Sequence, residues 1–573
     1  MKRNRLASLS DSPLSGLPRE AVRLLAMGAV GKHHLLHVSR VLFDATAHVP
    51  PNLAERCARV GLELMLQAWV DDPLDGGLAQ SIRSIHERHG RLFKPLPPAL
   101  ANSLATVSSM WSMPEDDREF LGLFETRDAD TIFTYLDSAL AASDHALYRL
   151  NQARQAAGIF GRGKWLVERI RAASHMNQPL ESKILGDSLL LAGEPDEAAK
   201  AYDAIEGGES WPGLLFRMGN ALASMGRLED AKDAWRASVE RYPWMINAVL
   251  VYHDAVSRTD RSVSRVPDNV AVLLYCFDKG DDLDATLKSV FESELGGASV
   301  LVLDNGSGSS TRDMLSGWAS RIDEPRLVTL RAPVNVGAPG ARNWLIREVL
   351  ERGHEWAAFL DDDVDVPKDW LGRLAAAAKA YPEAGVWGAK VVNATVRQGI
   401  QGADFTLQPD AGEQPSLGAP GENPPKPIAL SALHHFDPDY GQFRYMRPCA
   451  SVMGCCHLFR TATLEKLGGF DLRFSPSQFD DVDHDLRLLS QEMPAVFQGH
   501  CTVGHRRPFP HLANVSWEQA KAAEANHYKL RAKHTAHMTT LLAQQESILL
   551  EDLNGKWRRL LESGALSQDA LKS

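Results

Sequence analysis

The sequence contains few cysteines, no long apolar run and no surplus of basic residues. Its six cysteines among 573 residues are irregularly spaced and form no Cys-x-x-Cys pair, so neither a disulfide framework nor a zinc site is expected. No uninterrupted apolar stretch approaches the roughly 18 residues that span a bilayer, and the basic N-terminus continues into Ser, Asp and Pro instead of an apolar segment. These absences predict a cytoplasmic protein with no integral membrane segment.

Net charge and length narrow the class of protein further. The formal net charge of -11 argues against a general nucleic-acid binder, and we expect no nucleic-acid partner. Hydrophobic residues make up 44% of the chain and charged residues 24%, which provides enough apolar material for sizeable cores. Because 573 residues exceed the size at which a single core stops growing, we expect about two or three domains.

The first half of the chain has a helical pattern. After a tail over residues 1–16, residues 17–256 carry apolar side chains at three- and four-residue spacing, as in LPREAVRLLAMGAV. This spacing places the apolar side chains on one face of each helix. We therefore predict an all-helical domain over 17–256.

One internal repeat lies within this helical half. GDSLLLAGEPDEAAKAYDAI from Gly186 aligns with GNALASMGRLEDAKDAWRAS from Gly219, which also pairs Tyr202 with Trp235. Small residues where two helices approach, and an aromatic residue that closes the pair, resemble tetratricopeptide repeats, here near 183–250. The resemblance implies a protein-binding or orienting role, with plain structural support as the alternative.

The second half has a different pattern. Residues 257–269 are polar and aperiodic and are predicted to be a linker. Beyond them, four apolar runs that read as strands alternate with helical segments: VAVLLYCF, ASVLVLDNGS, PRLVTLRA and EWAAFLDDD. Such alternation implies an α/β domain with a parallel sheet and crossover helices. We assign this domain to 270–510 and a C-terminal helical extension to 511–573.

Polar side chains follow the predicted strands at the sheet edge where ligands bind. Asp278 comes after the first strand and Asp304 ends the second. Asp304, followed by Asn, Gly and Ser, can accept hydrogen bonds from a base or ribose, although Asp-Asn-Gly is also a common turn. The third strand leads into NVGAPGARN (335–343), whose small residues let the backbone approach a ligand and whose Arg342 lies near a helix start.

The fourth strand ends in three consecutive aspartates within FLDDDVDVPKDW (359–370). If the chain stays extended there, Asp361 and Asp363 face one side and Asp362 the other. Like charges this close repel one another, and a hard divalent cation between them would offset the repulsion. A solvated acidic loop is the alternative, but here an apolar run leads directly into the aspartates.

Taken in order, these segments resemble the family-2 glycosyltransferases of the GT-A fold. Five stretches carry the resemblance over 268–510: the first strand and helix, LVLDNGSGSSTRD, NVGAPGARN, FLDDDVDVPKDWL and the run from GCCHLF to FDDVDHDLRL. The resemblance implies a Rossmann-like, mixed and mostly parallel sheet flanked by helices. It also implies a nucleotide-diphosphate sugar as donor and Mn²⁺ or Mg²⁺ as cofactor.

The resemblance assigns the donor and metal residues. It makes Asp304 a uracil or ribose contact, places Asp278 near the base and sets Arg342 on the donor side, with Asp361 and Asp362 also assigned to nucleotide-sugar binding. For the metal it implies Asp363 as a direct ligand helped by Asp361. His505 is the third ligand that the family pattern favours, with His500 as the competitor.

The acidic run FDDVDHDLRL (479–488) resembles the family's catalytic segment. Asp481 aligns with the expected general base, with Asp480 beside it where the family often has Glu. A base is required because an acceptor hydroxyl is a poor nucleophile until its proton is removed. Asp483 and Arg487 are four residues apart and are expected to form a supporting ion pair.

The resemblance therefore implies a metal-dependent inverting glycosyltransferase. The acceptor would be a hydroxyl of a glycan, or of a peptide or protein presented by the helical domain. Two alternatives remain open, a non-catalytic helical-repeat adaptor that binds a nucleotide sugar and a nucleotidyltransferase. A Pro/Gly-rich insertion over about 407–427 departs from the family pattern and is predicted to be a loop or lid near the acceptor.

Overall fold

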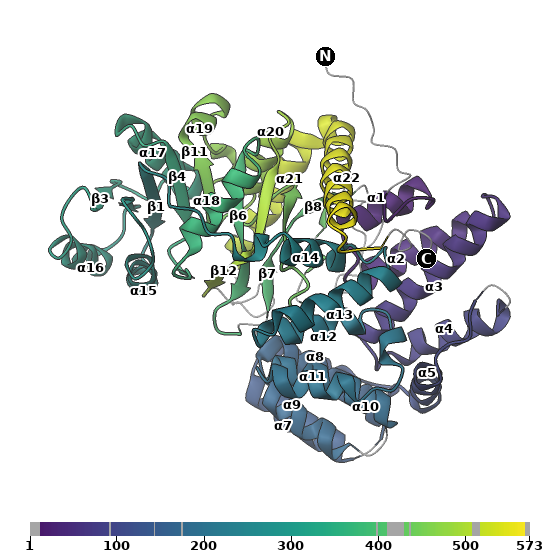
Figure 1. Cartoon of the computed structure of the whole chain (residues 1–573). Coiled ribbons are helices and arrows are strands. Elements are labelled where there is room, and N and C mark those ends of the chain that lie inside the picture. Colours follow the sequence, from purple (N-terminus) through teal and green to yellow (C-terminus); the bar gives the residue numbers. More distant parts are fainter. Residues whose placement is uncertain are drawn as a thin grey trace. The chain divides into compact units, whose positions relative to one another are not determined.

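The structure is a computed structural model of the whole chain, shown in Figure 1. It describes residues 12–90, 93–142, 144–173, 176–396, 399–408, 429–431, 433–434, 437–506 and 516–567. The start of the predicted tail, through residue 11, and the predicted insertion from residue 409 lie outside the described residues. Among the described helices, none is both long and apolar enough to cross a membrane.

The chain forms two compact units. The first consists of Met1–Ser257, Phe436–Phe443 and Leu553–Ser573, and the second of Arg258–His435 and Arg444–Asp552. The short segment 436–443 therefore belongs to the first unit, although it lies between two parts of the second unit along the chain. Residues 436–443 of the predicted 270–510 domain, and residues 553–573 of the predicted 511–573 extension, therefore belong to the same unit as the helical half of the chain.

The first unit is all-helical, as expected for residues 17–256. Its helices are α1 (Arg19–Met27), α2 (Lys32–Ala45), α3 (Pro51–Asp71), α4 (Gly76–Arg88), α5 (Pro98–Met110), α6 (Arg118–Thr126), α7 (Ala129–Ala141), α8 (Ala146–Phe160), α9 (Gly163–Ala172), α10 (Gln178–Leu191), α11 (Pro195–Asp203), α12 (Leu214–Ser224), α13 (Leu228–Arg241) and α14 (Ile246–Val256), with a short 3-10 turn at Gly208–Ser210.

The two aligned segments form the helix pairs α10–α11 and α12–α13. A Cβ atom added at Gly186 would lie 2.3 Å from the ring of Tyr202, and one added at Gly219 would lie 2.5 Å from the ring of Trp235. Each glycine thus lets an aromatic side chain of the second helix pack directly on the backbone of the first, which is the close approach that the repeat predicts.

Segment 436–443 is held by polar and aromatic contacts inside the first unit. The guanidinium of Arg217 on α12 lies 3.9 Å from the centre of the Tyr440 ring, a cation–π distance. The side-chain Nδ2 of Asn247 on α14 donates to the main-chain oxygen of Gln442 at 3.1 Å. These contacts explain why the segment groups with the helices.

The second unit contains a mixed, mostly parallel sheet, which confirms the expected fold class. Its strands lie in the order β10-β12-β6-β11-β4-β1-β2-β3, with β5 paired to β12 and β7 to β6. Strands β1, β2, β3, β4, β6 and β12 run in one direction. Their bounds are β1 (Val270–Cys276), β2 (Ser299–Asp304), β3 (Leu327–Arg331), β4 (Trp356–Leu360), β5 (Val364–Asp365), β6 (Val386–Asn393), β7 (Ile400–Gly402), β10 (Met446–Cys449), β11 (Cys456–Arg460) and β12 (Ala495–His505), while β8 (Thr406–Gln408) pairs separately with β9 (Ala429–Ser431).

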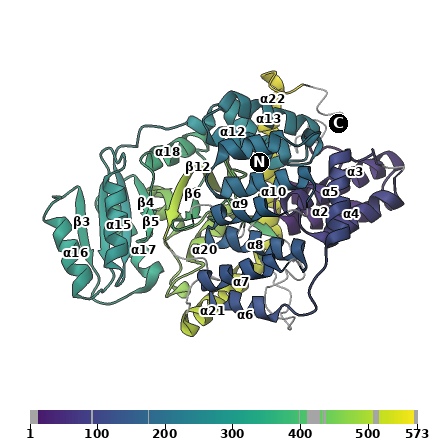
Figure 2. The same ribbon diagram turned by 90° about the horizontal axis from the view of Figure 1, so that it is seen from below.

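Helices cover both faces of this sheet. They are α15 (Gly280–Phe291), α16 (Ser309–Ala319), α17 (Gly337–Glu351), α18 (Trp370–Ala380), α19 (Thr461–Leu467) and α20 (Asp480–Leu489), with 3-10 turns at Thr259–Arg261, Leu472–Phe474 and Thr535–His537. Helices α21 (Trp517–His534) and α22 (Met538–Glu562) follow along the chain, and α22 belongs to the first unit from Leu553 on. Figure 1 shows α15 and α17 on opposite sides of β1. Figure 2 shows α15 and α16 near β3, and α18 beside β6 and β12.

Burial on both faces makes the central strands nearly continuous apolar runs, as parallel strands require. Val272 and Leu274 of β1 pack into one cluster with side chains of α15, α16 and α18. The register pairs Cys276 with Asp304 and Leu274 with Leu360. The polar residues that follow β1, β2 and β4 therefore reach the same edge of the sheet.

Candidate active site

Three residues meet at this edge in an arrangement that fits a metal ion. One ligand atom from each of Asp361, Asp363 and His505 lies within 4.8 Å of the others. Asp361 is fixed after β4 by its N–H, which donates to the carbonyl of Cys455 at 3.2 Å. Two carboxylates and one imidazole are a donor set that suits a divalent cation such as Mn²⁺ or Mg²⁺.

His505 ends strand β12, beside Val364 of β5. Its Nε2 lies 3.0 Å from Oδ1 of Asp363, and its Nδ1 lies 2.6 Å from Oε1 of Gln401. Because an amide oxygen only accepts, Nδ1 donates to Gln401, and Nε2 is the nitrogen that faces Asp363 and the candidate cation position. Among the described residues, the candidate metal cluster contains His505 and not its competitor His500.

Lys279 is a site residue that the sequence patterns did not reveal. Its Nζ lies 3.0 Å from Oδ2 of Asp363 and 3.5 Å from Oδ1 of Asp362, and its side chain is 46% exposed. Burial alone would lower the pKa of Lys279, but attraction to Asp362 and Asp363 outweighs it and raises that pKa. The ammonium group therefore stays charged against the acidic cluster.

The three consecutive aspartates have different environments. Burial raises the pKa of Asp362 to about 7, with Lys279 opposing the shift. Burial would also raise the pKa of Asp363, but hydrogen bonding and attraction to His505 and Lys279 lower it. Burial raises the pKa of Asp361, against the effect of Arg342. Asp363 is thus the carboxylate of the three that is held most firmly in its charged form.

Asp304 and Asp278 build the turn that follows β2. Oδ1 of Asp304 accepts from the N–H of Ser307 at 2.7 Å, and Oδ1 of Asp278 accepts from the N–H of Gly308 at 2.7 Å. Oδ2 of Asp304 is buried without a hydrogen-bond partner among the described residues, and lies 3.7 Å from Nε of Arg331. Each carboxylate thus uses one of its oxygens as a hydrogen-bond acceptor within the turn.

Arg342 is buried between the candidate metal cluster and α20. One guanidinium nitrogen, Nη1, lies 2.6 Å from Oδ2 of Asp480, while Nη2 lies 3.4 Å from Oδ1 of Asp361. The same Nη2 donates to the carbonyl of Gly454 at 3.4 Å. The sequence analysis expected Arg342 on the donor side. In the structure its guanidinium contacts both Asp361 and Asp480.

We expect Arg342→Met to destabilise the fold by about 3–5 kcal/mol, because it leaves the buried Asp480 carboxylate without its cation. Urea unfolding followed by circular dichroism measures this loss. The double variant Arg342→Met/Asp480→Leu removes both charges and should recover most of the stability. A single variant that costs less than about 1 kcal/mol would contradict a tightly paired buried ion pair.

Asp481 is the second residue of α20, next to Asp480, and its carboxylate faces Gly454. Oδ2 of Asp481 accepts from the N–H of Gly454 at 3.0 Å, and Oδ1 accepts from its neighbour's N–H, that of Val482, at 2.9 Å. A Cβ atom at Gly454 would lie 2.5 Å from Oδ2, so only glycine permits this contact. Gly454 thus contacts Asp481 through its N–H and Arg342 through its carbonyl. Because Arg342 also pairs with Asp480 and Asp361, it connects the start of α20 to Asp361.

The expected ion pair between Asp483 and Arg487 is confirmed, with 3.1 Å between the Arg487 Nε and a carboxylate oxygen. Asp483 is completely buried, and α21 adds two partners, Lys533 at 2.8 Å and His534 at 2.8 Å. The sequence did not predict these two contacts, because nothing in the local pattern links α20 with α21.

Comparison with known proteins supports the resemblance noted in the sequence. The sequence model of glycosyl transferase family 2 matches residues 271–468, which confirms that resemblance over this range. The O-antigen biosynthesis protein RfbC of Myxococcus xanthus is 29% identical over 218 residues, which are 36% of this chain. The chain spans only 14% of the length of RfbC.

Two solved structures match parts of this chain, both with low TM-scores. GalNAc-T7 with UDP, GalNAc and Mn²⁺ is 12% identical, with a TM-score of 0.33 over 44% of this chain and 48% of that one. The mannosyltransferase PcManGT from Pyrobaculum calidifontis, in complex with GDP-Man and Mn²⁺, is 16% identical, with a TM-score of 0.33 over 62% of this chain and 89% of that one.

Proposed function

We propose that this protein is a metal-dependent inverting glycosyltransferase that moves a sugar from a nucleoside-diphosphate sugar to a hydroxyl acceptor. The match of residues 271–468 to glycosyl transferase family 2 supports the class of reaction. The observation that carries metal dependence is the convergence of Asp361, Asp363 and His505 within 4.8 Å. A divalent cation held there supplies charge stabilisation to the departing nucleoside diphosphate.

Other residues of the candidate site take part in proton transfer and in nucleotide binding. Asp481 accepts the proton of the acceptor hydroxyl as the oxygen attacks the anomeric carbon from the face opposite the diphosphate, which inverts that carbon. Arg342 fixes Asp480 beside the base. Oδ2 of Asp304, which accepts no hydrogen bond from the described residues, accepts from the uracil or ribose, while Asp278 holds the turn near the base.

The acceptor is proposed to be a glycan, or a peptide or protein presented by the helical unit. Paired helices such as α10–α11 and α12–α13 commonly form protein-binding surfaces. Tests of this role need the intact chain, because segment 436–443 packs within the helical unit through Tyr440. Removal of residues 1–256 would strip that segment of its partners.

The test is to incubate the full chain with Mn²⁺ and a panel of nucleotide sugars, with and without acceptor lysate. Release of free nucleoside diphosphate that increases with acceptor would support the proposal. Donor binding without release would instead favour a non-catalytic adaptor. Release of pyrophosphate would favour a nucleotidyltransferase. Either of these last two results would overturn the proposal that the protein transfers a sugar.

The contact between Lys279 and Asp363 gives a prediction with two opposite signs. We expect Lys279→Met to tighten the binding of Mn²⁺ alone by about threefold or more, because an ammonium group no longer competes for the carboxylate. The same change should weaken binding of a nucleoside diphosphate by about tenfold, since a phosphate-binding cation is lost. Mn²⁺ titration by electron paramagnetic resonance and calorimetry with UDP or GDP measure the two effects.

Lys288→Met is the matched control, because Lys288 lies on α15, the helix that begins directly after Lys279. Its side chain is 61% exposed and pairs only with Asp284 among the described residues. It should change neither affinity. Affinities for Mn²⁺ and nucleotide that move in the same direction in Lys279→Met would contradict the role given to Lys279.

A further inference from the structure

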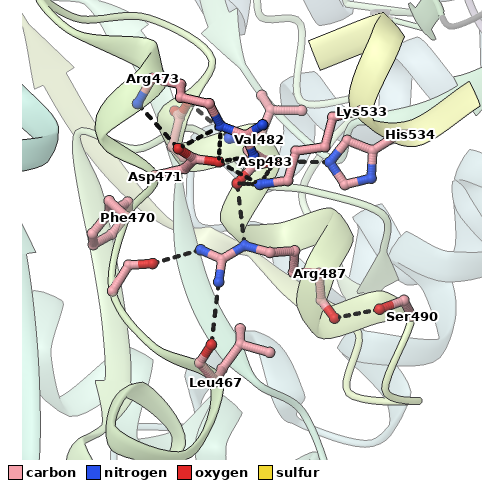
Figure 3. Close-up of polar contacts among 12 residues, drawn as sticks. Leu467, Phe470, Asp471, Arg473, Val482, Asp483, Arg487, Ser490, Lys533 and His534 are labelled. Atoms are coloured by element: carbon pink, nitrogen blue, oxygen red, sulfur yellow. Dashed lines mark hydrogen bonds and ion pairs between the residues drawn. The ribbon is translucent and has the colours of Figure 1, made fainter. Parts of the chain in front are cut away.

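Figure 3 shows a cluster of polar side chains around one buried carboxylate, Asp483, and this cluster connects three separate segments of the second unit. Asp483, in the first turn of α20, contacts Arg487 of its own helix and both Lys533 and His534 of α21. His534 is itself buried, at 5% exposed. Burial would raise the pKa of Asp483, but hydrogen bonds from His534 and Lys533 outweigh it and lower that pKa, so the carboxylate is held as an anion.

The partners of Asp483 extend to the loop before α20. Nζ of Lys533 also lies 2.7 Å from Oδ2 of Asp471. The guanidinium of Arg487 donates to the main-chain oxygens of Leu467 at 3.3 Å and Gly469 at 2.6 Å. A single cluster thus fixes the loop at 467–471, the start of α20 and the end of α21 with respect to one another.

Helix α21 also holds the bend that leads into α20. Gln478 and Phe479 have φ values of 79° and 65°, a left-handed conformation that costs a non-glycine residue roughly 1–2 kcal/mol. Nδ2 of Asn526 donates to the main-chain oxygens of Phe474 at 2.6 Å and Ser477 at 2.8 Å. The ring of Phe479 stacks on His527, with centroids 5.2 Å apart.

These contacts hold the first turn of α20 on two sides. Residues two apart on an α-helix point about 200° apart, so Asp481 and Asp483 face nearly opposite directions. Asp481 faces Gly454, and Asp483 faces α21. A strained bend persists only where its surroundings over-determine it. Loosening α21 would therefore let the first turn of α20 rotate and carry Asp481 with it.

We propose that α21 is a positioning element for the base Asp481. Lys533 and His534 act through Asp483, and Asn526 acts through the bend at 474–479. The inference rests on the proposed function, in which Asp481 removes the acceptor proton. None of the α21 residues touches the metal cluster in any contact described, so their effect falls on the proton-transfer step and spares donor binding.

Three lysine variants of the full chain test this role. Lys533→Met, which keeps the length of the side chain but loses its charge, should lower kcat for transfer by about 10- to 100-fold, because small misplacements of a catalytic group are costly. The KM for donor and the affinity for UDP or GDP with Mn²⁺ should stay within about twofold. Lys533→Arg should recover most of kcat, since it can pair with both Asp471 and Asp483.

Lys521→Met is the matched control, because Lys521 lies on the exposed face of α21 and pairs with Glu524 at 2.8 Å. It should leave kcat unchanged. If Lys533→Met does not fold, Asn526→Ala carries the same test through the bend, with an expected loss in kcat of about 10-fold or more at unchanged donor affinity. A purely structural role would instead lower kcat and donor affinity together, as the folded fraction falls.

Hydrogen exchange measured by mass spectrometry separates the inference from the proposed function. Amides of 480–489 should exchange faster in Lys533→Met than in the natural chain or in Lys521→Met. Unchanged exchange, or a kcat within about twofold of the natural chain, would overturn the positioning role. A natural chain that binds no donor and transfers no sugar would overturn the proposed function instead, whatever the exchange shows.

Discussion

Asp363→Asn is expected to lower sugar transfer by about 10³-fold or more and to abolish Mn²⁺ binding at micromolar concentration. The reason is that Asp363 is the strongest anion of the cluster, in contact with both His505 and Lys279. Loss of its charge removes several kcal/mol of stabilisation from the departing diphosphate. Mn²⁺ titration and nucleoside diphosphate release measure the two effects.

Asp313→Asn is the matched control, because Asp313 lies exposed on α16, outside the candidate metal cluster. It should retain full activity and metal affinity. Chelation of the natural chain should reproduce the loss seen in Asp363→Asn, and added Mn²⁺ should reverse the chelation but not the substitution. Transfer that survives chelation would contradict metal dependence.

Asp481→Asn is expected to lower kcat for transfer by about 10²- to 10⁴-fold, which is the usual contribution of a general base. The amide oxygen can still accept from the N–H of Gly454, so the fold and the start of α20 should persist. Donor and Mn²⁺ affinities should remain within about threefold of the natural chain, because Asp481 is not a member of the candidate metal cluster of Asp361, Asp363 and His505. Single-turnover kinetics and calorimetry separate the two quantities.

Two outcomes would contradict this assignment of the base. One is transfer that stays within about threefold of the natural chain, which would move the proton to another group. The other is a donor affinity that falls in parallel with kcat, which would place Asp481 in donor binding. Lys521→Met serves again as the control for handling and folding.

Local pattern was sufficient to predict strands β1–β4, their shared direction and the acidic residues that follow them. Val270–Cys276 and Ser299–Asp304 are apolar runs with helical segments between them, and a parallel sheet is the arrangement that buries such runs. The pairing of Asp361 with Asp363 is a property of one short stretch of chain. The ion pair between Asp483 and Arg487 is likewise local, because one helical turn separates them.

The sequence pattern did not reveal the residues that complete the site from a distance. Lys279 meets Asp363 across 84 positions, Gln401 meets His505 across 104, and Lys533 meets Asp483 across 50. A single lysine, glutamine or histidine in a polar segment has no periodicity that marks it. Such contacts depend on how crossover helices and loops close, which local propensity does not specify.

The sequence by itself determined that a strand ends in closely spaced carboxylates and that an acidic helix start lies about 120 residues further on, because both features are written in adjacent residues. Only the tertiary structure decided that His505 joins Asp361 and Asp363, that Arg342 pairs with Asp480, and that segment 436–443 belongs with the helical unit. The physical reason is the same in each case. Side-chain spacing along a strand or helix is fixed by the backbone, whereas contact between distant segments is selected by the packing of the whole unit.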